Sequence, residues 1–352
     1  MVRKMGHEID LKGKLPRTDL AIDLITKEMD GVKKQVKEIG ICKVTTVKIE
    51  KEAEAILNKK QGNYTTIEFE DITDHENEQQ VLKIVTEELT KLLNKMKIPE
   101  TASCLMVGLG NENSTPDALG PLAISHVLVT NHLFELGEVE KGFRKTYAIK
   151  PGVMGTTGME TRELLKGIVQ EIRPDFMIVI DALASGSVER LNKTIQMTDT
   201  GIHPGSGVQN QRKEISSEYF SIPVLALGVP TVVDAATIVS DTIYYMQKNF
   251  AYTKEHLSKP SHKLSFGHEN YLKKEVTIAP EDNEKLMGSL GSLSEEERKQ
   301  YILEVLTPIG YNFIVTPKEI DYFVEKLGLL LGNALNHALH RNISFEKEGF
   351  LT

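Results

Sequence analysis

The sequence predicts an α/β protein with a mixed, largely parallel sheet flanked by helices, extra strands near the N-terminus and helices at the C-terminus. Between about residues 100 and 250, short apolar runs alternate with segments whose apolar residues recur at helical spacing, as in βαβ units. Two alternating, β-branched segments precede this region, and amphipathic segments follow it. These observations define the fold class.

The N-terminal part of the chain is expected to contribute an arm, two strands and two helices. Residues 1–19 are polar, basic and without periodicity, so we expect an arm that adds little to a core. Residues 20–352 are then expected to form a single α/β domain with its core at about 100–250. The patterns predict a short helix over 20–35, strands at 44–49 and 64–69, and a long amphipathic helix over 76–97.

The central region predicts a regular alternation of strands and helices. Strands are expected at 103–107, 146–149, 176–180, 193–197 and 224–227, and helices at 118–134, 160–172 and 234–246. The run 176–180 is almost wholly apolar, which favours a central parallel strand buried on both faces. Ser294-x-x-Glu297 and Thr316-x-x-Glu319 match capping boxes, and the second should open a long helix that covers the sheet.

Composition limits the class of partner. The chain has 42 Lys and Arg against 50 Asp and Glu, a net charge of −8, which argues against direct nucleic-acid binding as its main purpose. The N-terminus lacks an apolar leader and no run of 18 apolar residues occurs, so we expect a cytoplasmic protein without membrane contact. Cys42 and Cys104 lie in apolar segments and are expected to be buried and unpaired.

The stretch 103–121 combines a strand, a glycine loop and a helix start. Its apolar run ends in Gly108-Leu109-Gly110-Asn111, and Ser114 to Asp117 then offer a capping hydroxyl, a proline and an acid. In an α/β sheet, a reactive site lies at the carboxyl ends of such strands.

A second acid, Asp181, directly follows the apolar strand 176–180. Burial there costs desolvation unless the acid is used or paired, although it could also simply cap the next turn. If the strands are parallel, Asp117, Asp181 and the loop 228–231 converge. Two neighbouring carboxylates cannot both ionise easily, so such a pair can activate water and protonate a leaving amine.

Other chemistries were weighed on the same residues. The acids with a histidine could bind a divalent metal, and His203, in the glycine-rich loop 201–207, is the best-placed histidine. GxxxxGK[ST], HExxH and GxSxG do not occur, and the third glycine of a dinucleotide fingerprint would be Asn113. We therefore expect no cofactor and no metal.

With these residues in view, the chain resembles the germination proteases of spore-forming bacteria over nearly its whole length. The resemblance rests on RTDLA at 17–21, GLGNxxxTPDALGP at 108–121, PGVMGTTGMET at 151–161, PDFMIVIDALAS at 174–185, TDTGIHPGSGV at 198–208, LGVPTVVDAATI at 227–238 and VTPKEID at 315–321.

The resemblance implies a core fold similar to the hydrogenase-maturation proteases and an atypical aspartic-type endopeptidase with Asp117 and Asp181 as its catalytic pair. It also implies small acid-soluble spore proteins as substrates, a location in the forespore or spore core, a self-processed zymogen and a homotetramer.

Self-cleavage is expected between Asp19 and Leu20. The family cleaves after glutamate in a Thr-Glu-(Ile/Phe)-Ala context, and Thr18-Asp19-Leu20-Ala21 is a near copy with the shorter acid. Cleavage there would remove the basic arm. An N-cap at Thr18 or Asp19 is the alternative interpretation.

Within this reading we assign roles to the remaining residues. Asp181 is expected to be the base and Asp117 the proton donor, and backbone amides from Gly108 through Gly110 to Asn111 are expected to hold the oxyanion. The loop Gly155-Thr156-Thr157 is expected to bind substrate backbone, with His203 as a further candidate. Two alternatives stay open: a metal-dependent maturation protease that uses the same acids, and a non-catalytic module that binds spore proteins.

Overall fold

The structure is a computed structural model that describes residues 18–25, 28–137, 139–204, 213–257, 278–306 and 313–343. Within these residues the chain forms two compact units. The larger one contains the described residues between 18 and 233 and those from 316 onward, and the smaller one contains the described residues between 234 and 315.

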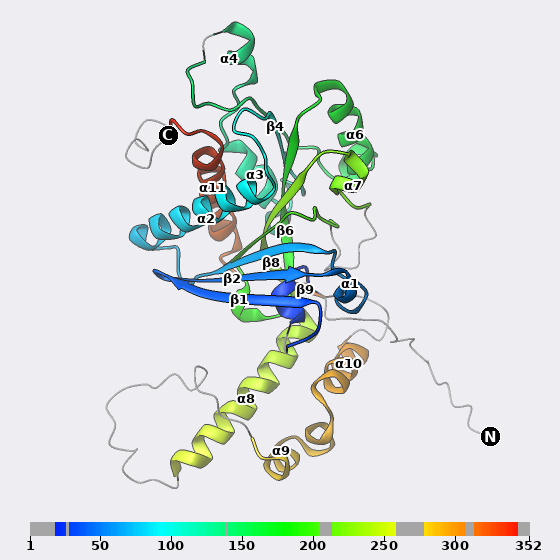
Figure 1. The fold of residues 1–352 in the computed structure, drawn as a ribbon. Helices are drawn as coiled ribbons and strands as arrows, with labels where there is room; N and C mark the ends of the chain where they lie inside the picture. The colour runs from blue at the N-terminus through cyan, green and yellow to red at the C-terminus, as the bar shows by residue number, and fades with distance from the viewer. Residues whose placement is uncertain are drawn as a thin grey trace, which may run out of the picture. The chain divides into compact units, whose positions relative to one another are not determined.

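The larger unit is built on a mixed sheet, which confirms the predicted fold class (Figure 1). In the described residues its strands follow the order β1 (Val32–Ile39), β2 (Cys42–Ile49), β3 (Gly62–Glu68), β7 (Thr194–Thr198), β8 (Val224–Asp234), β6 (Phe176–Ser185), β4 (Cys104–Gly108) and β5 (Thr146–Ile149). The pairs β8–β6, β6–β4 and β4–β5 are parallel, and the pairs from β1 to β8 are antiparallel.

Helices cover both faces of this sheet (Figure 1). Alternate residues of β6 face opposite ways: Ile178 and Ile180 pack into the core with helices α2 (His75–Lys95), α3 (Leu119–Ser125) and α11 (Ile320–Leu339), whereas Met177 and Val179 join the core under α6 (Thr161–Ile172) and α7 (Ser217–Phe220). All four side chains are fully buried, so β6 is the doubly buried central strand that its apolar run predicts.

The predicted helix over 20–35 is wrong. The chain instead forms a short 3-10 helix, η1 (Ala21–Leu24), and then the edge strand β1. Gly31, at φ +78°, turns the chain, and β1 pairs with β2 along its whole length, from Val32 opposite Ile49 to Ile39 opposite Cys42. The pairing overrides a local pattern that is too polar to specify either structure. Helix α1 (Lys51–Leu57) lies between β2 and β3, in a stretch for which the sequence predicts no helix.

The predicted helix over 118–134 is also wrong as one element. It is split into α3 and α4 (Asn131–Leu136) because Asn336 of α11 intercepts the backbone between them. The Asn336 amide donates to the His126 carbonyl oxygen at 2.9 Å, and its oxygen accepts from the Leu128 N–H at 2.7 Å. A buried side chain from 208 residues further on thus takes the bonds that would have continued the helix.

One predicted capping box is confirmed and the other is wrong. Ser294 Oγ accepts from Glu297 N–H at 3.2 Å, and the Glu297 carboxylate accepts from Ser294 N–H at 2.8 Å, at the start of α10 (Glu295–Leu306). Helix α11 begins after Glu319 without a side-chain cap. The Thr316 hydroxyl donates instead to the Thr231 carbonyl oxygen at 2.9 Å.

The described part of the smaller unit is mostly helical and also contains the two-residue strand β9 (Ile314–Val315). It contains α8 (Ala235–Leu257), α9 (Pro280–Met287), the 3-10 helix η7 (Gly288–Ser292) and α10. The predicted helix over 234–246 is therefore confirmed and longer than expected. Asn283 ties α9 to η7 by donating to the Gly291 carbonyl oxygen at 2.8 Å, and it accepts from Gln247 of α8.

Both cysteines are buried and free, as predicted. Burial raises the pKa of Cys42 to about 11 and also raises the pKa of Cys104, so both thiols stay protonated near neutral pH. None of the helices in the described part of the chain is both long and apolar enough to cross a membrane.

His340, at the end of α11, makes stability depend on pH. Its ring is fully buried, and its Nδ1 accepts from the Arg144 N–H at 3.2 Å. Burial, assisted by the Arg144 charge, lowers the pKa of His340 from 6.5 to about 4. Between these values the unfolded chain takes up a proton that the folded chain does not. Folding stability therefore falls as pH drops from 6.5 toward 4.

We expect His340 to cost up to about 3 kcal/mol of stability across this window. Urea unfolding of the full chain at pH 7 and pH 4.5 measures the loss. His340→Gln should reduce the difference between the two pH values, whereas His132→Gln, at an exposed position of α4, should leave it unchanged. Equal pH dependence in all three proteins would contradict the assignment.

Candidate functional site

The candidate site lies where β4 stops pairing with β6. Gly108, the last residue of β4, is opposite Ile180, and the Leu109 N–H donates to the Ile180 carbonyl oxygen at 2.8 Å. Asp181 is the next residue of β6 and pairs with Gly228 of β8. It lies within the strand rather than after its end, and only 3% of it is exposed. One carboxylate oxygen accepts from the Ala182 N–H at 3.0 Å.

The glycine loop that follows β4 positions Asp117 beyond the end of that strand. Asp117 ends the 3-10 helix η2 (Thr115–Asp117), and the Asn111 N–H donates both to its carbonyl oxygen at 3.1 Å and to its carboxylate at 2.8 Å. Gly110, which precedes Asn111, has φ +110°, and a Cβ atom there would overlap the Asp117 carbonyl oxygen. Glycine is therefore required for both the conformation and the close approach.

β8 contributes the third segment. The Thr231 side chain is fully buried, and its hydroxyl donates to the Pro116 carbonyl oxygen at 2.7 Å. Residues of η2 also lie within 8 Å (Cα–Cα) of β6. The three segments thus meet as predicted, but Asp181 and residues 228–231, which were expected in loops after their strands, lie within β6 and β8. Their meeting brings a buried acid and a partly exposed acid to the same edge of the sheet.

The glycine loop already uses two of the amides that we expected to face a substrate. The Leu109 N–H is bonded to Ile180, and the Asn111 N–H is bonded to Asp117. An oxyanion site at Gly108, Gly110 and Asn111 therefore stays a prediction, and the observed role of the loop is to position Asp117.

The second predicted loop forms the short helix α5 (Met154–Thr157) after β5. Because β5 is parallel to β4, this segment leaves the sheet at the same edge as the acids. The hydroxyls of Thr156 and Thr157 both donate to the Val153 carbonyl oxygen, at 3.0 and 3.1 Å. Gly155 is exposed, with open space around it. Substrate binding by this segment stays a prediction.

His203 pairs with an acid of a neighbouring segment. Its Nε2 lies 3.2 Å from a carboxylate oxygen of Glu214, which also binds Lys60, and about half of the His203 side chain is exposed. Residues 205–207 of the predicted glycine-rich loop lie outside the described residues. Among the residues that the structure does describe, no group of three His, Cys, Asp or Glu side chains is arranged to hold a metal ion.

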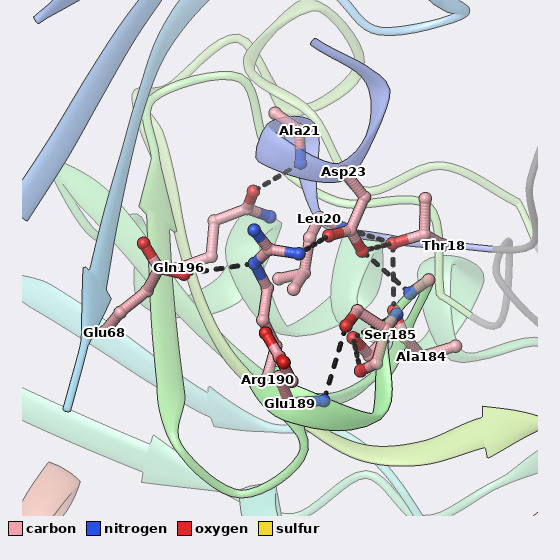
Figure 2. A network of polar contacts seen from close by, with 12 residues as sticks. Thr18, Leu20, Ala21, Asp23, Glu68, Ala184, Ser185, Glu189, Arg190 and Gln196 are labelled. Carbon is pink, nitrogen blue, oxygen red and sulfur yellow. Dashed lines mark hydrogen bonds and ion pairs between the residues drawn. The ribbon is translucent and has the colours of Figure 1, made fainter. Parts of the chain in front are cut away.

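The predicted cleavage segment lies beside Ala184 of β6 (Figure 2). Ala184 is three residues past Asp181 on the same strand. The Asp19 N–H donates to the Ala184 carbonyl oxygen at 2.9 Å, and the Ala184 N–H donates to the Asp19 carboxylate at 2.8 Å. Leu20 is fully buried. The rest of the predicted arm, residues 1–17, lies outside the described residues.

Sequence reasoning assigned no correct role to four residues that organise this region: Thr231, Thr316, Lys59 and Gln196. Thr231 lies in the predicted loop 228–231 and is a polar residue in an otherwise apolar run, which is a signal for its own role. Thr316 was expected to be a helix cap. Lys59 and Thr316 act on segments far away in sequence, which local patterns do not reveal.

Comparisons with known proteins identify the family of the chain. The family model described as germination protease matches residues 16–352. Curated germination proteases are 46% identical in Bacillus velezensis over 98% of both chains, 46% identical in Geobacillus sp. strain WCH70 over 99% of this chain and 100% of the relative, and 44% identical in Bacillus subtilis strain 168 over 97% and 98%. A peptidase family matched over this length identifies the class as peptide hydrolase. The chain belongs to the germination protease family.

Gly110→Ala tests how the loop holds Asp117. The added methyl group must displace the Asp117 carbonyl, and it also strains a backbone at φ +110°. We expect peptidase activity to fall at least about tenfold, as small displacements of reacting groups do. Gly167→Ala, in α6 with open space around it, is the matched control and should retain activity. Full activity of Gly110→Ala would show that this position is not needed.

Proposed function

We propose that this protein is an endopeptidase that initiates degradation of small acid-soluble spore proteins during germination, with Asp117 and Asp181 as a general acid–base pair acting on water. The observation that carries the proposal is the convergence of the two acids. The β4–β6 pairing delivers Asp181, and the glycine loop together with Thr231 holds Asp117 at the same sheet edge.

The chemistry follows from a shared proton. Of two nearby carboxylates, one stays ionised and takes a proton from water as the water oxygen attacks the substrate carbonyl carbon. The other, protonated, donates its proton to the amide nitrogen as the C–N bond breaks. Each turnover thus passes a proton between the pair, and no nucleophilic serine or cysteine is required.

The proposal includes synthesis as a zymogen, self-cleavage between Asp19 and Leu20, assembly as a homotetramer and a location in the spore core. The docked segment supports a regulated cleavage. Asp19 is hydrogen-bonded to Ala184. Ala184 is three residues from Asp181, which is roughly 10 Å along an extended strand. The Asp19–Leu20 bond therefore has to move away from Ala184 before this acid pair can cleave it.

Intact-mass measurements over time at mildly acidic pH test the acid pair. Wild-type protein should lose a fragment that ends at Asp19, whereas Asp117→Asn and Asp181→Asn should each retain full length, with cleavage slowed at least about a thousandfold, because neither variant can complete the proton transfers.

Asp71→Asn is the control for this experiment, since Asp71 lies in an exposed turn where its carboxylate binds Thr73. It should process like wild type. Processing by either active-site variant would remove that residue from the mechanism. No fragment from any sample, with or without added nickel, would refute self-processing and favour the binding or metal-dependent alternatives.

Asp19→Glu tests the cleaved position. Glutamate restores the acid that the family prefers, and its longer side chain no longer fits the 2.8 Å bond with the Ala184 N–H. Both effects should accelerate self-cleavage, by about five- to tenfold for one hydrogen bond of typical strength. Rates of fragment release at a single pH measure the change. An unchanged or slower rate would count against Asp19 as the cleaved residue.

A further inference from the structure

Strand β8 contacts the segments that carry both acids. Gly228 is opposite Asp181 in the pairing of β6 with β8, and a Cβ atom on Gly228 would lie only 2.9 Å from the Asp181 carbonyl oxygen. Three residues further along β8, the Thr231 hydroxyl donates at 2.7 Å to the carbonyl oxygen of Pro116, the residue that precedes Asp117. One short stretch of β8 therefore contacts both sides of the acid pair.

Thr231 is an extra residue in the pairing between β6 and β8. Leu183 is opposite Pro230, whereas the next residue of β6, Ala184, is opposite Val232. The register therefore shifts by one residue, and Thr231 is the residue that the shift leaves between these two pairs. Such β-bulges redirect a side chain and are common next to active sites. Here the extra side chain is fully buried, and its hydroxyl bonds to η2.

A second threonine, Thr316, holds the backbone of Thr231. The Thr316 hydroxyl donates to the Thr231 carbonyl oxygen at 2.9 Å. Thr316 precedes α11, and α11 lies so close to α3 that a Cβ atom on Gly328 would overlap Leu122 of α3. Because α3 directly follows η2, these contacts form a closed ring that runs from β8 through η2, α3 and α11 back to β8.

The ring restrains Asp117 in a way that the glycine loop does not. The Asn111 N–H binds Asp117 from the β4 side. A contact on one side still allows η2 to rotate about that contact, and the bond from Thr231 to Pro116 restrains η2 from the β8 side. Proton transfer needs the acid within hydrogen-bond reach of the reacting atoms, so a small rotation of η2 is costly for the reaction.

We propose that Thr231 is a positioning residue that sets the separation of Asp117 from Asp181. The bulge in β8 directs its hydroxyl to η2, and Gly228 keeps the same strand close to Asp181. Thr316 supports this arrangement by holding the Thr231 backbone. The effect of Thr231 on the reaction passes through Asp117. This inference rests on the proposed function, because it assumes that the two acids work together.

Paired substitutions at the two threonines test the proposal in the full-length chain. Thr231→Val and Thr316→Val remove the hydroxyl and keep a β-branched side chain, whereas Thr231→Ser and Thr316→Ser keep the hydroxyl. Thr90→Val is the matched control. The Thr90 hydroxyl also donates to a backbone carbonyl oxygen, that of Thr86 at 2.8 Å, but it lies in α2, which carries neither acid.

The first readout is steady-state cleavage of a purified small acid-soluble spore protein. Thr231→Val should lower kcat at least about tenfold and leave KM unchanged, because a displaced acid is missed in the transition state and not in substrate binding. Thr316→Val, which loosens Thr231 by one hydrogen bond, should lower kcat about fivefold. Both serine variants should recover most of the rate, and Thr90→Val should match the wild type.

The second readout, amide hydrogen exchange at Asn111, does not depend on activity. The Asn111 N–H donates to Asp117, so it reports how firmly η2 is held. Its exchange should rise about fivefold or more in Thr231→Val and Thr316→Val. It should stay at the wild-type rate in both serine variants and in Thr90→Val.

If the wild-type chain cleaves the spore protein, the inference requires both changes in Thr231→Val. Unchanged kcat, unchanged exchange at Asn111 or a rise in KM alone would overturn it. Melting temperatures show whether each variant is folded, and Thr316→Val decides by the same criteria if Thr231→Val is not. Absence of cleavage by every protein, the wild type included, would contradict the proposed function, and the exchange at Asn111 would then decide the role of Thr231 by itself.

Discussion

The register between β4 and β6 is the constraint on which the rest of the site depends. Gly108 is opposite Ile180, and the Leu109 N–H continues the ladder by one bond before the chain turns away. A slip of one residue would send every side chain of β6 to the opposite face, moving Asp181 away from the edge that Asp117 occupies. The apolar side chains on both faces of β6 are buried, which makes such a slip costly, so the packing of the core also fixes the position of Asp181.

Close backbone contact at this edge follows from two glycines. A Cβ on Gly108 would overlap the backbone of Gly120, and one on Gly120 would overlap Leu109. Because both residues lack a Cβ atom, α3 can approach the end of β4. The 3-10 helix η2 directly precedes α3 and therefore places Asp117 next to the sheet. Thr231 completes the arrangement from β8, and Thr316 in turn fixes Thr231. The position of Asp117 therefore rests on the adjacent glycine loop and on two distant parts of the chain, which contribute Thr231 and Thr316.

The docked N-terminal segment and the acid pair share β6 as a common support. Asp181 lies where the strand separates from β4, and Ala184 lies where it receives Asp19. β8 pairs with β6 at both positions, with Gly228 opposite Asp181 and Val232 opposite Ala184.

The sequence by itself determined the strands that have long apolar runs and the positions of both acids after them. The apolar runs 103–107 and 176–180 identify buried parallel strands, and Asp117 and Asp181 follow from their places after those runs. Local spacing was sufficient because burial on both faces leaves an unmistakable apolar run. Only the tertiary structure decided the break between α3 and α4 and the bond from the Thr316 hydroxyl to Thr231 in place of a helix cap. It also decided the two bonds that Gln196 makes to the backbone on either side of Leu20. Each of these depends on hydrogen bonds between residues 85 to 210 positions apart, whose energy no local pattern contains.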